Sequence, residues 1–259
     1  MAFVPCAFYQ EVEEKIMAFT FNLSVAGMTF QVTTLHRYSQ KYCERYLIDE
    51  PGEHIIQISQ EEIDAERRLC SETETGVSES LCTSPDHYLE SVCLLRTLAN
   101  YITLHNRILM HGSAIAVNGK GYIFTALSGT GKSTHTALLR KLHGENAVMI
   151  NDDKPFLHIA EDQIFVCGTP WMGKHFLGNN VTVPLAGIFF LRRSEENVLQ
   201  KLEPDAALTL LLTQCHRPED PEKMMHTLEM LDSILSRVPL YDFGCNMDIS
   251  AAELSSSVM

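Results

Sequence analysis

The chain has 259 residues, of which 45% are hydrophobic, and a formal net charge of −13 at pH 7. This size and apolar content are enough to bury one large core, or a core with an accessory lobe. The acidic balance is not interrupted by a basic stripe, and no run of about 18 apolar residues occurs, so we expect neither a nucleic acid nor a membrane as a partner.

The cysteines and the first residues indicate the compartment. The eight cysteines are scattered without a C-x-x-C pair, unlike the disulfide framework of a short secreted protein. The opening segment, MAFVPCAFYQEVEEK, does not show the basic start and long apolar run of a signal peptide. We therefore expect a cytoplasmic protein with reduced thiols. Its oligomeric state is left open, a homo-oligomer included.

The N-terminal part predicts a small α+β lobe. Residues 20–34 alternate around a glycine and predict a hairpin, residues 54–59 predict a strand, and the acidic segment that follows has helical spacing. Residues 70–86 are rich in Ser, Thr and Glu and contain Gly and Pro, a composition typical of a linker. We therefore expect an accessory lobe with its linker over residues 1–86 and a second domain over residues 87–259.

The second domain predicts strands and helices in alternation. After a buried helix over 86–102, strands are expected over 107–117 and 121–127, joined by an Asn-Gly turn. The remaining elements are a helix ending at Gly144, a strand over 147–151, a hairpin within 155–168, a buried strand over 183–193, helices over about 204–215 and 220–237, a strand over 239–244 and a terminal helix. This order predicts an α/β fold with a mixed sheet.

A phosphate-binding loop is indicated between the second of these strands and the next helix. The segment ALSGTGKS (126–133) fits the Walker A pattern except that Ala126 replaces the first glycine. Its glycines let backbone N–H groups face phosphates, Lys132 would reach the β and γ oxygens, and the Ser133 hydroxyl would bind Mg²⁺. The plain alternative is a glycine-rich turn before an ordinary helix. The residues expected to bind nucleotide are Ser128, Gly129, Thr130, Gly131, Lys132, Ser133 and Thr134.

Two carboxylates follow the next strand. Asp152 and Asp153 end a strand that a short helical crossover should bring beside the phosphate loop. One carboxylate there can hold a metal ion, and a second can accept the proton of a hydroxyl that receives a phosphoryl group. Aspartate is also common as a cap in turns after strands, which is the structural alternative.

The hairpin turn makes His111 a candidate site residue. If Asn118 and Gly119 form the turn, His111 lies across from Ala126; if Gly119 and Lys120 form it, His111 lies across from Ser128. Both registers bring the imidazole to the mouth of the loop, where it can polarise a group or shuttle a proton. A packed core histidine is the alternative.

The segment GTPWMGKHF (168–176) holds Lys174 and the only tryptophan of the chain. A loop with so many turn residues is commonly a surface turn that only connects other elements. Lys174 could instead supply positive charge to the transferred phosphoryl group or to the acceptor. His135 and His175 show no metal-ligand spacing and are expected to be structural or solvated.

Three short motifs together resemble the catalytic domain of HPr kinase/phosphorylase and its relatives, small bacterial HPr-kinase-related proteins included. They are HGSAIAV, which begins at His111, SGTGKS (128–133) and NDDK (151–154), and the resemblance covers about residues 107–192. It implies a phosphate-loop core of the kind shared with ATP-dependent phosphoenolpyruvate carboxykinases. It also implies ATP and Mg²⁺ as cofactors, proton transfer by His111 and Asp152, and metal binding by Ser133 and Asp153.

The chain departs from that family at two places. Thr134 follows Gly-Lys-Ser where HPr kinases usually have Glu, and GNNVTVPLAG stands where they have Pro-Gly-Arg-Asn. We predict an ATP/Mg²⁺-dependent kinase that phosphorylates a hydroxyl, such as a serine in a protein or peptide or a small molecule. The acceptor itself is not identified. One alternative is a non-catalytic nucleotide-binding regulator that holds a partner with its N-terminal lobe. The other is a carboxykinase-type lyase, for which only Arg192 and Arg193 are near the site.

Overall fold

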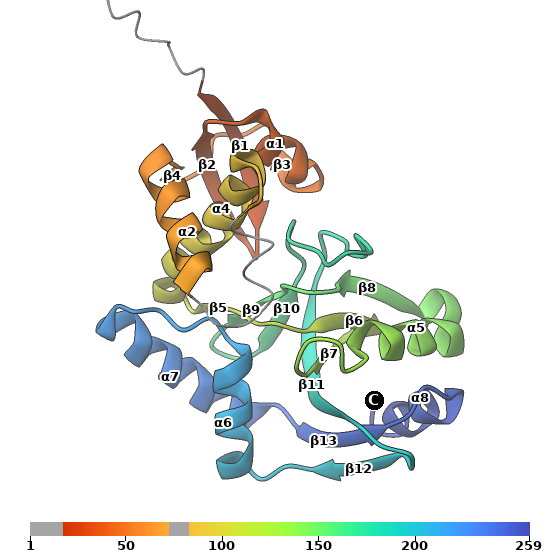
Figure 1. Ribbon diagram of the computed structural model, residues 1–259. Coiled ribbons are helices and arrows are strands. Elements are labelled where there is room, and N and C mark those ends of the chain that lie inside the picture. The colour runs from red at the N-terminus through yellow and green to blue at the C-terminus, as the bar shows by residue number, and fades with distance from the viewer. Residues whose placement is uncertain (1–17, 73–82) are drawn as a thin grey trace, which may run out of the picture.

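The computed structural model describes residues 18–72 and 83–259 and shows an α/β protein with two sheets (Figure 1). The smaller sheet has the strand order β3-β1-β2-β4, and the larger mixed sheet contains the order β5-β9-β10-β11-β7-β6-β8 with β13 and β12 beyond β11. The α/β class with a mixed sheet, predicted from the sequence, is confirmed. The opening segment, on which the expectation about a signal peptide rests, lies outside the described residues.

The smaller sheet forms around the predicted hairpin. Strands β1 (Phe19–Val25) and β2 (Met28–Thr34) pair antiparallel, and every second residue of β2 is buried, as expected for a strand with one face on a core. Strands β3 (Leu47–Ile48) and β4 (His54–Gln57) flank them. The other elements of this part are helix α1 (Arg37–Tyr42), the 3-10 turn η1 (Glu44–Tyr46) and helix α2 (Gln60–Glu72).

Helix α4 (Asp86–Ile102) packs against the smaller sheet. Its side chains Leu89, Leu94 and Leu98 belong to the same core as the buried residues of β1 and β2. That core also contains Phe156 and Trp171, so it continues into the part of the chain that carries the larger sheet. Residues 73–82 of the predicted linker lie outside the described residues, and the domain boundary at residue 86 stays a prediction.

The larger sheet holds most of the remaining chain. Its strands are β5 (Arg107–Leu109), β6 (Ser113–Val117), β7 (Lys120–Thr125), β8 (Ala147–Asn151), β9 (Phe156–Ile159), β10 (Ile164–Cys167), β11 (Thr182–Arg193), β12 (Val198–Lys201) and β13 (Leu240–Cys245). Strand β11 pairs parallel with β7 and β13 but antiparallel with β10, which makes the sheet mixed. Short 3-10 turns, η2 (Thr103–His105) and η3 (Gly144–Asn146), precede β5 and β8.

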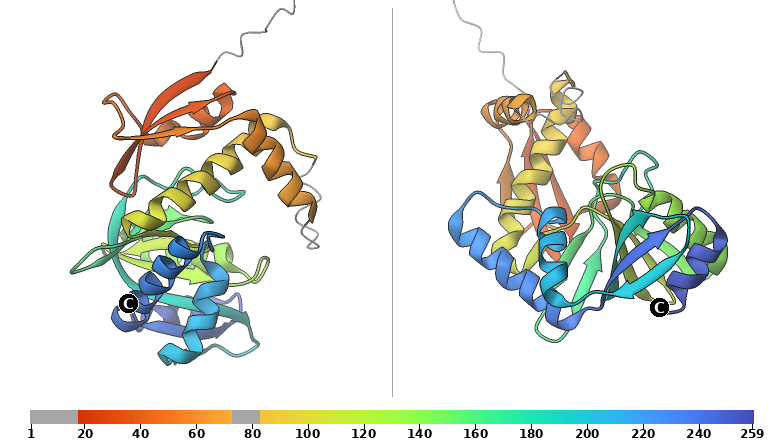
Figure 2. Two further views of the ribbon diagram at one scale, coloured as in Figure 1. Left: turned by 90° about the vertical axis from the view of Figure 1, so that its left-hand side faces the viewer. Right: turned by 60° about the horizontal axis from the view of Figure 1, so that its bottom comes forward.

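Helices cover both faces of this sheet. Helices α5 (Lys132–His143) and α8 (Ile249–Ser256) pack on one face, and α6 (Pro204–Gln214) and α7 (Pro221–Arg237) pack on the other (Figure 2). Strand β6 has buried side chains on both faces of the sheet. Ala114 and Ala116 enter the core under α6 and α7, whereas Ile115 and Val117 enter the core under α5. A strand buried on both faces is close to continuously apolar, as β6 is after Ser113.

The turn between β6 and β7 is formed by Asn118 and Gly119, which have φ values of 52° and 79°. Two consecutive positive φ angles are those of a type I′ turn, whose twist matches the strands it joins. Val117 pairs with Lys120 and Ser113 with Phe124, the first of the two registers that the sequence allowed.

The single strand expected over 107–117 is wrong. The chain leaves the ladder between β5 and β6, where residues 110–112 instead run against 153–155: Met110 N–H donates to Pro155 O and Gly112 N–H donates to Asp153 O. Strand β5 continues this pairing with β9. A Cβ at Gly112 would lie 2.8 Å from Ile123, so glycine permits the close approach at this change of partner.

The structure describes five free thiols. Cys43, Cys93, Cys167 and Cys215 are buried free thiols, and Cys245 is half-buried. Within residues 18–72 and 83–259, no helix has both the length and the apolar character needed to cross a bilayer.

One buried carboxylate ties helix α4 to the segment after β2. The fully buried Glu90 accepts hydrogen bonds from the backbone N–H groups of Leu35 and His36 and from the Ser39 hydroxyl. Glu90→Ala should lower the free energy of unfolding by about 2–4 kcal/mol, because three donors, of which the Ser39 hydroxyl is fully buried, lose their acceptor. Urea unfolding followed by circular dichroism measures this loss. The exposed Glu253→Ala on α8 is the control, expected within about 0.5 kcal/mol of the parent; an equal loss in both variants would contradict the assignment.

Candidate functional site

A pocket of about 510 Å³ opens where strand β7 runs into helix α5. It gathers, from four separate segments, every residue that was expected to have a catalytic, nucleotide-binding or metal-binding role in the kinase except Thr130. Its lining residues are His111, Ser128, Gly129, Gly131, Lys132, Ser133, Thr134, Asp152, Asp153, Gly173, Lys174 and His175.

The loop between β7 and α5 has the backbone of a phosphate cradle. Gly129 and Gly131 have φ values of 77° and 124°, which residues with a side chain rarely adopt. Helix α5 starts directly after Gly131, so the positive end of its dipole and its unpaired N–H groups face the loop. The arrangement can bind an anion.

Lys132 is held inside this loop. Its side chain is only 9% exposed, and Nζ donates to the carbonyl oxygens of Ala126, at 2.9 Å, and Leu127, at 3.4 Å. Burial lowers its pKa, although the nearby Asp153 carboxylate opposes the shift. The loop thus keeps a desolvated ammonium group at its centre, where a bound anion would interact with it more strongly than in water.

The strand with the two carboxylates reaches the loop by a different path from the expected one. Strand β8 is not adjacent to β7: it pairs antiparallel with β6, which lies between them. Because β6 is antiparallel to both neighbours, β7 and β8 end at the same edge of the sheet. Asp152 and Asp153 therefore still follow β8 into the pocket.

Asp152 is the more buried of the two carboxylates, with 5% exposure. Its Oδ1 accepts the backbone N–H of Gly173 at 2.6 Å, whereas Oδ2 is buried without a hydrogen-bond partner among the described residues. Burial raises the pKa of Asp152, although hydrogen bonds from backbone groups, Gly173 foremost, oppose the shift. This carboxylate is therefore the easier of the pair to protonate.

Asp153 lies among positive groups. Its Oδ1 is 3.3 Å from His111 Nε2 and its Oδ2 is 3.7 Å from Lys154 Nζ. Burial alone would raise its pKa, but the hydrogen bond from His111 and the charges of Lys154, His111 and Lys132 hold the pKa of Asp153 below its ordinary value. The neighbouring carboxylates thus differ in the ease with which they take up a proton.

His111 reaches the pocket through the segment that leaves the β6–β7 ladder. Its backbone N–H donates to Gln214 O at 2.7 Å and its carbonyl accepts the Thr125 hydroxyl at 2.7 Å. The imidazole lies against Asp153 because residues 110–112 pair with 153–155. The hairpin register thus correctly placed His111 near the phosphate loop. The contact between His111 and Asp153 depends on a backbone pairing that the sequence did not reveal.

The loop over 168–176 closes the pocket on the side of the carboxylates. Trp171 is buried and its Nε1 donates to Ser91 O in helix α4 at 2.8 Å. A Cβ at Gly173 would lie 3.2 Å from Asp152 Oδ2, so glycine lets this backbone approach the carboxylate. Lys174 and His175 are exposed and line the pocket.

His135 has a structural position. Its ring is 2% exposed, packs on Phe124 and Phe243, and its Nε2 is 3.0 Å from the Ser255 hydroxyl. Burial lowers the pKa of His135 to about 4.

Asn151 was assigned no site role from the sequence, and Arg193 was placed near the site only for the lyase alternative, yet both shape this site. The fully buried Asn151 donates from Nδ2 to Thr169 and Trp171, and its Oδ1 accepts the N–H groups of Asp153 and Lys154. A polar residue that ends an apolar strand was the available signal for Asn151. Arg193 donates to Gly129 O at 2.6 Å from the end of β11, a contact that no sequence pattern indicated.

The oxygen atoms that could hold a metal ion here are few. Among the described residues, no group of three or more His, Cys, Asp or Glu side chains could hold a metal ion. Ser133 and Asp153 line the same pocket and offer two oxygen ligands. Such a set suits Mg²⁺, which keeps several waters and binds through one or two protein oxygens together with phosphate oxygens.

Sequence comparison finds no matching family model and no matching curated protein. Structural comparison finds the HPr(Ser) kinase/phosphatase from Coxiella burnetii, with 13% sequence identity and a TM-score of 0.34, over 58% of this chain and 87% of that chain. Similarity at this level concerns the course of the backbone and does not extend to substrates.

The two carboxylates should have opposite effects on stability. A raised carboxyl pKa means that the folded state binds its proton more tightly than the unfolded state, so stability falls as pH rises above the ordinary value of about 4. Asp152→Asn should therefore raise the free energy of unfolding at pH 7 in metal-free buffer, and the gain should disappear toward pH 4. Urea titrations at the two pH values measure it.

Asp153→Asn is the matched comparison. The depressed pKa of Asp153 contributes stability above the ordinary carboxyl pKa, and this contribution is lost as pH falls through the folded value. The variant should be less stable than the parent at pH 7. Equal shifts of the same sign in both variants would contradict the electrostatic difference described here.

Proposed function

We propose that the protein is an ATP- and Mg²⁺-dependent kinase that transfers the γ-phosphoryl group to a hydroxyl of a protein, a peptide or a small molecule. One observation carries the proposal: a phosphate-type loop with a buried lysine, two carboxylates of different character and a histidine line one pocket. A nucleotide-binding site alone requires the loop and a metal ligand, whereas the second carboxylate has no such use.

In the proposed complex, the loop binds the phosphates of ATP. The backbone N–H groups around Gly129 and Gly131 and the start of α5 contact phosphate oxygens. Lys132 exchanges its bonds to the carbonyls of Ala126 and Leu127 for the β and γ oxygens. Ser133 and Asp153 would hold a Mg²⁺ ion, which would supply positive charge to the bound phosphates.

Asp152 is the proposed base. Its Oδ2 is buried and has no hydrogen-bond partner in the described part of the chain, so it is available to accept a proton. The Gly173 N–H fixes the carboxylate through Oδ1. As the acceptor oxygen bonds to the γ-phosphorus, its proton passes to Asp152. The bond between the γ-phosphorus and the bridging oxygen breaks, and ADP leaves with that oxygen.

His111 and Lys174 supply the remaining polar contacts. His111 is oriented by Asp153, at 3.3 Å, and can donate to an oxygen of the transferred group or carry a proton. Lys174 lines the same pocket from an exposed loop position and can add positive charge near the acceptor.

Lys132→Ala and Asp152→Asn should separate binding from transfer. Lys132→Ala should weaken ATP binding by at least about tenfold, because the loop loses its one buried cation, and should abolish transfer. Asp152→Asn should keep ATP binding but lower transfer by about 10²–10⁴-fold, because the base is lost. The assay incubates the protein with γ-labelled ATP and an extract of its own cells and follows the label.

The control is Lys120→Ala, an exposed lysine after the hairpin turn, which should leave binding and transfer unchanged. Undiminished transfer in Asp152→Asn would contradict the assignment of Asp152 as the base. A parent protein that binds ATP but labels nothing would favour the non-catalytic regulator.

Ser133→Ala should raise the Mg²⁺ concentration needed for half-maximal ATP binding by about tenfold, because one oxygen ligand is removed. Isothermal titration calorimetry over a range of Mg²⁺ concentrations measures the change. Binding of ATP in EDTA is the internal control and should be unaffected; a loss of the same size in EDTA would contradict metal binding by Ser133.

A further inference from the structure

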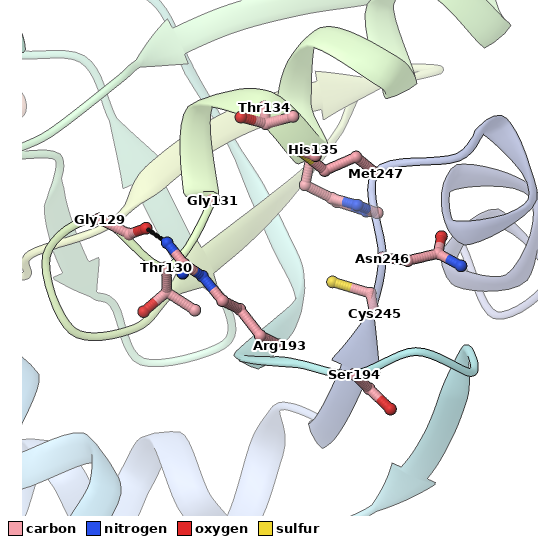
Figure 3. Close-up of a pocket in the computed structure, with 10 residues that line it drawn as sticks. All are labelled: Gly129, Thr130, Gly131, Thr134, His135, Arg193, Ser194, Cys245, Asn246 and Met247. Atoms are coloured by element: carbon pink, nitrogen blue, oxygen red, sulfur yellow. Dashed lines mark hydrogen bonds between the residues drawn. The ribbon is translucent and has the colours of Figure 1, made fainter.

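A second pocket, of about 440 Å³, borders the phosphate loop (Figure 3), and neither Asp152 nor Asp153 lines it. Gly129, Gly131 and Thr134 line both pockets, so the two pockets adjoin each other at the loop. The other side chains that matter here come from the loop, from α5 and from the ends of β11 and β13: Thr130, His135, Arg193, Cys245, Asn246 and Met247.

The position of this pocket follows the course of a nucleotide. A triphosphate that lies over the loop with its γ end toward Asp152 must leave the loop at its other end, carrying the sugar and the base. The second pocket begins at the loop residues that also line the first. A base placed there would be continuous with phosphates bound at the start of α5.

The lining is suited to a flat aromatic ring. The Arg193 guanidinium, fixed by its bond to Gly129 O, offers a planar cation that can stack on a base. The Met247 side chain is 77% exposed, unusual for a thioether in a chain with a well-formed core, and beside it lie the half-buried Cys245 thiol and the His135 ring (Figure 3). An aromatic ligand would bury this apolar surface.

Three polar side chains of the lining, those of Asn246, Thr130 and Ser194, are directed elsewhere. His135 Nδ1, which has no hydrogen-bond partner among the described residues, is buried within the protein. The Asn246 amide oxygen accepts the Asp248 N–H at 3.0 Å, and its nitrogen donates to Glu195 O at 3.1 Å. The Thr130 hydroxyl donates within the loop, to Leu127 O. Figure 3 shows the Ser194 hydroxyl and the Asn246 amide pointing away from the loop. Among the residues that line the pocket, these side chains therefore do not read the edge of a base.

We propose that this second pocket binds the nucleobase by stacking and apolar contact, without side-chain recognition of the base edge, so that ATP and GTP bind alike. The inference rests on the proposed nucleotide binding at the phosphate loop. It adds that the base lies in the second pocket and that the flat face of its ring, and not its edge, is recognised.

The test titrates ATP, GTP and inorganic tripolyphosphate, each with Mg²⁺, into the full-length protein by calorimetry. ATP and GTP should bind within about threefold of each other, and tripolyphosphate about tenfold more weakly, because it has no ring to stack. Met247→Ala should weaken ATP and GTP alike by about three- to tenfold and leave tripolyphosphate unchanged. Met225→Ala is the matched control: Met225 is a similarly exposed methionine (61%) on α7, on the opposite face of the sheet, and its loss should change none of the three.

The outcomes distinguish the two proposals. If tripolyphosphate binds as tightly as ATP, or if Met247→Ala leaves ATP binding unchanged, the base does not occupy this pocket, while the phosphate loop assignment stands. A preference for ATP over GTP of more than about tenfold would overturn the stacking mode, because it requires reading of the base edge. If neither ATP nor tripolyphosphate binds, the proposed function fails and this inference fails with it.

Discussion

The register of the β6–β7 hairpin is the constraint on which the site depends. The turn at Asn118 and Gly119 fixes which residues of the two strands face each other, and a slip by one residue would exchange the faces of both strands. Because β6 is buried on both sides, such a slip would exchange alanines with the larger Ile115 and Val117 in two cores at once. The register in turn fixes where β7 ends and thus where the phosphate loop stands relative to β8 and its carboxylates.

The pocket combines groups that are individually unfavourable for folding. Lys132 is a buried ammonium group that donates to two carbonyl groups. Asp152 is a buried carboxylate with one oxygen that no described residue pairs with. Each charged group would be better solvated in water than in the protein. Asn151 compensates in part, because one buried amide joins the ends of β8 and the loop over 168–176 by several hydrogen bonds. Groups that are kept despite their cost in stability are typical of binding and catalytic sites. The buried lysine and carboxylate therefore support the kinase proposal.

The sequence predicted elements that carry their own local signal. The Asn-Gly turn, the glycine-rich loop, the crossover helix and the buried strand β11 all have patterns within a few residues, and the structure confirms them. The break before β6 was not predicted, because HGSAIAV continues an apolar strand pattern while the cause of the break, pairing with residues 153–155, is distant in sequence. The same holds for Trp171, which looked like part of a surface turn but is buried through a bond to helix α4. The catalytic and binding roles of the site residues stay predictions.

The hydrogen bond from Trp171 to Ser91 connects the site to helix α4. The same short loop is anchored to α4 at one residue and holds the Asp152 carboxylate two residues later, through the Gly173 N–H. Helix α4 is in turn fastened to the segment after β2 by Glu90. Three hydrogen-bonded links therefore run from the segment after β2, through α4, to the backbone donor at Asp152. The carboxylate in the pocket is thus held in place by bonds that begin in the smaller sheet's part of the fold, as well as by its own strand.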